Sequence, residues 1–192
     1  MEKFMNKKQL KVTLILIGLM IVLVASESIF SNKMKFVALM NNNISDLKKY
    51  EAMDNKYTYN IPTLWNAQEK KYPGNYIVYD NDFKSDDMGI FGSVQVINTP
   101  KSVAEVIEEE KNTFVDNGDY KNTKEKINDI NMNKVRFSNN LDGKKNFVNT
   151  IYYFQTEKNN VIKISFKCNK DKYKENYDTI YKVIVESFKK SK

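Results

Sequence analysis

The sequence predicts an α+β protein in which an apolar N-terminal helix precedes a mostly antiparallel sheet packed with two helices. Three observations support this prediction. An uncharged apolar run follows a group of lysines at the N-terminus, several later segments alternate apolar and polar residues, and two segments carry apolar residues at helical spacing. Because the strands follow one another and the last helix returns to them, we expect α/β/α layers.

Composition limits the functions that this chain can have. Its 192 residues are 41% hydrophobic, which is enough for one domain with a packed core. The net charge is +7, but lysines and acids alternate along most of the chain and Arg136 is the only arginine, so we expect no nucleic-acid partner. Without histidine and with the single cysteine Cys168, the chain lacks a histidine base, a disulfide and a thiolate zinc site, and we expect no cofactor.

The first 28 residues predict a membrane anchor or a signal peptide. Four lysines and one acid precede the uncharged run at residues 12–26. A helix through residues 10–26 meets the membrane, and it spans the hydrocarbon core if Lys11 snorkels. We prefer an uncleaved anchor, but the small residues Ala25 and Ser26 keep cleavage as the alternative. Both interpretations place the remaining chain outside the cytoplasm, as the positive-inside rule also favours.

The chain beyond this segment divides into two predicted parts. Residues 29–50 resemble a juxtamembrane connector, in which Phe36 and Val37 belong to a short amphipathic helix that three consecutive asparagines interrupt. Residues 51–192 are long enough to bury a core of their own. We therefore expect a globular domain there.

Alternation of apolar and polar residues predicts the strands of this domain. They are expected at residues 57–61, 76–79, 90–97, 127–137, 147–156 and 161–168. Leu141, Asp142 and Gly143 predict a tight turn between the fourth and fifth of these strands. The last three strands should therefore form a consecutive antiparallel set.

Two helices are expected to cover the sheet. Ser102 and Glu105 form the pattern of a capping box, and Gly118 is the expected C-terminal cap of the helix that begins there. The apolar face of this helix is expected to hold Val103, Val106, Ile107 and Phe114. The apolar face of the final helix is expected to hold Tyr173, Tyr177, Ile180, Tyr181, Ile184 and Phe188.

The order of these elements resembles the PsbP-like family. The resemblance covers residues 55–190 and depends on the opening strand that runs into Pro62 and Trp65, on the strand around Ser93 before the Ser102 helix, and on the closing helix that ends at Phe188. Known members mostly bind other proteins or act as accessory factors, and several are bacterial envelope proteins. The resemblance therefore implies a membrane-anchored or secreted bacterial member that binds a partner, and it transfers no catalytic residue.

An acidic segment at residues 80–87 is the strongest candidate for chemistry. Its four carboxylates belong to Asp80, Asp82, Asp86 and Asp87, and hard cations such as Ca²⁺ prefer oxygen ligands. The spacing departs from that of an EF-hand loop, so we expect a solvated hairpin loop without a metal. The alternative is a secreted or anchored hydrolase, or a Ca²⁺-dependent protein, that uses this loop. Cys168 is expected to be a small core residue.

The last strand suggests a binding surface. Lys163, Ser165 and Lys167 alternate with its apolar residues, so they must share one face of the sheet. Lysines buried under a helix without partners would destabilise the fold, and we therefore expect that face to stay partly open. The sequence as a whole predicts a non-catalytic, membrane-tethered extracytoplasmic module of the bacterial cell envelope that binds an envelope protein.

Overall fold

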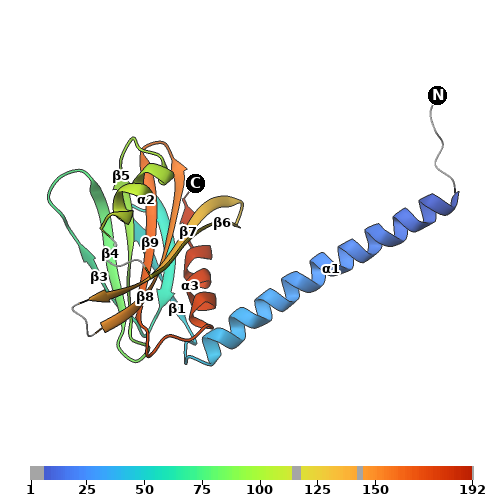
Figure 1. Ribbon diagram of the computed structural model, residues 1–192, viewed down its shortest axis with the longest axis horizontal. Helices are drawn as coiled ribbons and strands as arrows, with labels where there is room; N and C mark the ends of the chain where they lie inside the picture. Colours follow the sequence, from blue (N-terminus) through green and yellow to red (C-terminus); the bar gives the residue numbers. More distant parts are fainter. Residues whose placement is uncertain (1–6, 114–117, 142–144, 192) are drawn as a thin grey trace. The chain divides into compact units, whose positions relative to one another are not determined.

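The computed structural model describes residues 7–113, 118–141 and 145–191. The chain separates into two compact units at the boundary between Asn43 and Ile44. The first unit contains one helix, α1 (Lys7–Met40), and the second contains all the strands and the other two helices of the described residues (Figure 1).

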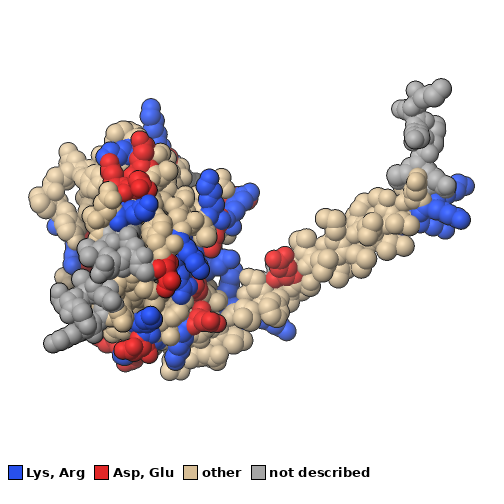
Figure 2. All heavy atoms as spheres, viewed as in Figure 1, with Lys and Arg blue, Asp and Glu red and all other residues tan. Residues whose placement is uncertain are grey.

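Helix α1 is continuous over 34 residues, which corresponds to a length of about 50 Å. It is long and apolar enough to cross a membrane, although a signal sequence would meet the same criteria. Figure 2 shows basic side chains near its start, followed by a long stretch without charge. Residues 29–40 continue this helix rather than forming a separate connector, because no glycine or proline interrupts residues 27–40.

Ten strands of the described residues form two antiparallel sheets. The smaller sheet has the order β1-β2-β10, and the larger has the order β3-β4-β5-β9-β8-β7-β6. The strands are β1 (Leu47–Ala52), β2 (Tyr57–Pro62), β3 (Asn66–Lys70), β4 (Ile77–Ser85), β5 (Ile90–Asn98), β6 (Gly118–Ile127), β7 (Ile130–Leu141), β8 (Lys145–Glu157), β9 (Asn160–Asn169) and β10 (Lys189–Lys190).

One face of the seven-stranded sheet packs against α3 (Tyr177–Glu186) and the small sheet. Tyr181 of α3 stacks on Phe166 of β9, with ring centroids 4.1 Å apart. Phe188 follows α3 and lies 5.2 Å from Phe154 of β8, centroid to centroid. The hydroxyl of Tyr59 in the small sheet accepts a hydrogen bond of 2.6 Å from the amide of Asn81 in β4. This closed face therefore combines aromatic packing with hydrogen bonding between the two sheets, while the buried hydroxyls of Thr150, Tyr152 and Tyr181 have no hydrogen-bond partner among the described residues.

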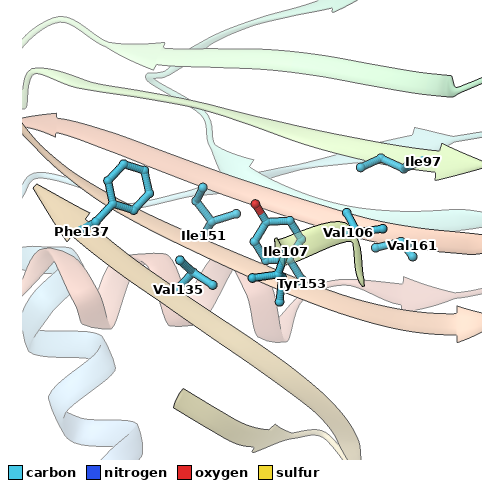
Figure 3. Close-up of a cluster of buried hydrophobic side chains, with 8 residues drawn as sticks. All are labelled: Ile97, Val106, Ile107, Val135, Phe137, Ile151, Tyr153 and Val161. Atoms are coloured by element: carbon cyan, nitrogen blue, oxygen red, sulfur yellow. The ribbon is translucent and has the colours of Figure 1, made fainter. Parts of the chain in front are cut away.

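The opposite face packs against α2 (Val103–Lys111) over only part of its area. Figure 3 shows this cluster, in which the two α2 side chains Val106 and Ile107 lie against side chains from four strands. The strand residues of the cluster are Ile97, Val135, Phe137, Ile151, Tyr153 and Val161. Because α2 has only nine residues, it cannot cover all seven strands.

The fold class and the capping box are confirmed. The amide of Glu105 donates to the hydroxyl of Ser102, and the carboxylate of Glu105 accepts from the amide of Ser102. The helix nevertheless ends at Lys111 rather than before Gly118, since the hydroxyl of Thr113 bonds to the carbonyl of Glu110 and closes the last turn. Gly118 instead begins β6. Phe114 and the predicted turn residues Asp142 and Gly143 lie outside the described residues.

The sequence missed four strands, and each is an edge strand: β1, β3, β6 and the two-residue β10, which lies at the other edge of the small sheet. β1 and β3 lie at one edge of their sheets, and β6 lies at the other edge of the large sheet. Edge strands expose polar side chains on both faces, so they lack the alternation that predicts a strand. The single strand expected at 127–137 contains the last residue of β6, a turn and most of β7, and the turn residues Asn128 and Asp129 both have positive φ.

The last helix is shorter than the predicted apolar pattern. Tyr173 precedes it in a turn where its amide donates to the carbonyl of Asn169. Phe188 lies beyond its end, but this side chain and Ile184 are both buried, as expected. The apolar spacing therefore identified the residues that pack, and it overstated the length of the helix.

Candidate binding groove

The uncovered part of the α2-bearing face forms an open groove of about 660 Å³. A smaller hollow of about 290 Å³ shares Ser93, Ser165 and Lys167 with it and continues the depression toward β7. We use the term open groove for the larger hollow, whose side chains come from β3, β4, β5 and β9. Its principal lining residues on this face are Asn66, Gln68, Lys70, Asp82, Lys84, Phe91, Ser93, Ser165 and Lys167.

Strand register aligns these side chains in rows across the sheet. Phe91 of β5 pairs with Lys167 of β9, which in turn pairs with Asn149 of β8. The next row contains Ser93 and Ser165, whose hydroxyl oxygens lie 2.9 Å apart. Side chains two residues apart point to the same face, so both rows open into the groove.

Most charged groups of the open groove are already paired. Lys70 forms an ion pair with Asp82. The ammonium of Lys84 lies 3.2 Å from a carboxylate oxygen of Asp86. The positive charges of Lys70 and Lys84 are therefore balanced by carboxylates of the same chain.

Lys167 differs from the other groove lysines. In the part of the chain that the structure describes, no carboxylate lies within 4.0 Å of its ammonium; the group instead sits 4.0 Å from the ring centroid of Phe147. Partial burial lowers the pKa of Lys167, because a charged group is less stable when water is removed from it. The open groove thus holds one half-buried cation without an opposite charge among the described residues.

Lys163 was expected on an open sheet face, but its ammonium is paired with a carboxylate of α2. Its ammonium lies 2.6 Å from a carboxylate oxygen of Glu110 in α2, and the hydroxyl of Tyr153 donates to the same oxygen over 2.6 Å. Lys163 therefore attaches α2 to the sheet. The sequence could not predict this contact, because the apolar spacing of a helix does not show which residue of the sheet its C-terminal end meets.

The four candidate metal ligands do not form one site. Asp80 and Asp82 lie within β4, and Asp86 and Asp87 lie in the turn after it, so the predicted loop at 80–87 is mostly strand. Asp80 is buried, accepts a hydrogen bond from Gln95 over 3.2 Å, and has a pKa raised by burial. Within the described residues, no three acidic, cysteine or histidine side chains are placed to hold a metal ion.

Cys168 lies on the closed face of β9 and is fully buried. Burial raises the pKa of its thiol to about 11. The thiol is therefore protonated near neutral pH, and it lacks the thiolate form that attacks substrates.

Phe91 is the groove residue that the sequence analysis overlooked. Its side chain is 43% exposed, which is unusual for a phenylalanine in the middle of a sheet. The same alternation that placed Lys167 on one face could have placed Phe91 there, since Ile90 is buried and Phe91 points the other way. The lining residues of β3 had no comparable signal, because that strand itself was not predicted.

Comparison with known proteins gives similarity in structure only. No protein-family model matches this chain, and no curated protein matches it by sequence. It is similar to the solution structure of cyanobacterial PsbP (CyanoP) from Synechocystis sp. PCC 6803, with 11% identity, a TM-score of 0.53, and coverage of 77% of this chain and 94% of that chain.

Two further solved structures are similar at low sequence identity. A crystal structure from Bacteroides thetaiotaomicron VPI-5482 has 14% identity and a TM-score of 0.52; the match covers 76% of this chain and 48% of that one, so this chain spans about half of it. A crystal structure of LpqN, involved in cell envelope biogenesis of Mycobacterium tuberculosis, has 10% identity and a TM-score of 0.46; the match covers 75% of this chain and 91% of that one. The CyanoP match, together with the sheet and its covering helices, shows that the globular unit has a PsbP-like fold.

Proposed function

We propose that this chain is a non-catalytic, membrane-tethered binding module on the outer side of a bacterial cytoplasmic membrane. In this proposal α1 is the tether and the open groove is the binding surface. The single observation that carries the binding role is the half-covered sheet face, where Phe91 is exposed and Lys167 is half-buried without a described carboxylate partner.

The tether follows from the charge and length of α1. Lysines cluster before the uncharged run, and positive flanks are retained on the cytoplasmic side. The run is long enough to cross the membrane core with some adjustment at its ends. The globular unit at residues 44–192 would then lie outside the cytoplasm.

The binding role is supported by the exposed aromatic side chain of Phe91 in the open groove. Aromatic side chains are enriched at the centres of protein interfaces, where charged groups other than arginine are depleted. Phe91 in a concave surface fits this description, and a groove of this volume lies within the usual range for ligand sites. The PsbP-like fold accounts for the sheet on which the groove lies, and the proposed binding role depends on the groove residues themselves.

Topology is tested by adding protease to intact protoplasts that make the full chain with an epitope tag at each end. The proposal predicts that the C-terminal tag is lost and that the N-terminal tag survives until the membrane is permeabilised. Survival of the C-terminal tag in intact protoplasts would overturn the proposed orientation. A soluble product that begins near Glu27 would show that the segment is cleaved and that the module is secreted.

Binding is tested in the same cells with a photo-crosslinking amino acid in place of Phe91. The proposal predicts a reproducible crosslinked product from this position. The matched control places the same amino acid at Glu51, an exposed residue of β1 in the small sheet. Equal crosslinking from both positions, or none from position 91, would contradict the assignment of the open groove as the binding surface.

A further inference from the structure

The shape of the groove favours an extended occupant. Together the open groove and the adjoining hollow are lined by residues of six neighbouring strands, from β3 to β7. At about 4.8 Å between neighbouring strands, the depression runs for about 24 Å across the sheet. An extended peptide advances about 3.3 Å per residue, so about seven residues fill this length.

The charges of the groove specify one feature of that occupant. Lys70 and Lys84 have carboxylate partners, whereas Lys167 has none among the described residues. A partner that supplies one carboxylate would compensate the remaining cation. Phe91 pairs with Lys167 across β5 and β9, so an apolar side chain beside that carboxylate would meet the exposed ring.

We propose that the open groove and the adjoining hollow take an extended, acidic peptide segment of a partner protein, with its carboxylate on Lys167 and a neighbouring apolar side chain on Phe91. The inference depends on the proposed function, because it names the partner of the same surface. The hydroxyl groups of Ser93 and Ser165, in the row next to Phe91 and Lys167, can form hydrogen bonds with the bound segment. Charge complementarity of this kind mainly sets partner choice and the rate of association.

The test uses the full chain in lipid nanodiscs and a displayed library of random seven-residue peptides. We expect enriched peptides to carry Asp or Glu next to an aromatic or aliphatic residue. Replacing Lys167→Gln should weaken their binding about tenfold, since a hydrogen bond to a charged group is being removed. The control Lys49→Gln removes an exposed lysine from β1, outside the groove, and should change affinity less than twofold.

Several results would overturn the inference. Enriched peptides without an acid, or peptides that bind Lys167→Gln as tightly as the unchanged protein, would show that Lys167 does not select a carboxylate. Failure to enrich any peptide over empty nanodiscs would exclude an extended peptide as the occupant. A crosslink from position 91 to a second copy of this chain would replace the partner with self-association.

The crosslinking experiment separates this inference from the proposed function. If position 91 crosslinks to a partner protein but the peptides show no dependence on Lys167, the groove is a binding surface whose occupant was wrongly identified. If neither experiment gives a signal from the groove, both the proposed function and the inference are wrong. Support for both requires a crosslinked partner segment that contains an acid.

Discussion

The two faces of the seven-stranded sheet are covered to different extents. On the closed face, α3 and the small sheet bury rings such as Phe166, Tyr181 and Phe188. On the other face, α2 covers one part and leaves Phe91 and Lys167 beside an open groove. Burial of apolar area stabilises a fold in proportion to that area. The closed face should therefore carry most of the stability, and the open groove should tolerate substitution and carry binding.

The largest expected effect is on the closed face. Phe188→Ala removes a ring that lies against Tyr57, Tyr59 and Phe154, and such a truncation costs about 3–5 kcal/mol. The melting temperature measured by circular dichroism should fall by at least about 6 °C. The matched variant Phe91→Ala should change it by less than about 2 °C. Similar losses in both variants would break the comparison between the faces.

The next largest effect concerns the attachment of α2. Glu110→Gln leaves Lys163 half-buried without its carboxylate and should cost about 1–3 kcal/mol in urea unfolding. Glu109→Gln on the same helix changes an exposed ion pair with Lys101 and should cost less than about 1 kcal/mol. If the two variants have the same stability, α2 is not held by the Glu110–Lys163 contact.

A smaller effect should depend on pH. Glu157 interacts with Lys56, the Tyr57 hydroxyl and Lys190, and these contacts, led by Lys56, lower its pKa to about 2. Because the pKa is lower in the folded state, the stabilisation is present above the unfolded value near 4.5 and disappears as the pH falls toward 2. The difference in unfolding free energy between the unchanged protein and Glu157→Gln should shrink from pH 6 to pH 3. A constant or growing difference would contradict this.

The smallest effect on stability is expected at the proposed binding residue. Burial already disfavours the charged form of Lys167, so Lys167→Met should leave the free energy of unfolding within about 1 kcal/mol. Loss of binding without loss of stability is typical of a residue that serves function. Destabilisation by more than that amount in urea unfolding would assign Lys167 to the fold instead.

The same contrast explains how far the sequence could predict the structure. Buried strands such as β5 and β9 alternate clearly, because one face must be apolar, and they were predicted. The edge strands β1, β3 and β6 have no such requirement. The candidate site was predicted in part, because alternation placed Lys163, Ser165 and Lys167 on one face. The ion pair between Lys163 and Glu110 could not be predicted, since it depends on where α2 packs against the sheet.

The central claim, that the open groove is covered by a partner in the cell, is tested most directly by cysteine protection. Gln68→Cys and Glu69→Cys are neighbours on β3, both exposed, and only Gln68 lines the groove. The native Cys168 is buried and should not react with a membrane-impermeant maleimide. In purified protein both new cysteines should react at similar rates, whereas in intact protoplasts Gln68→Cys should react several-fold more slowly than Glu69→Cys. Equal rates at the two positions in protoplasts would contradict the claim.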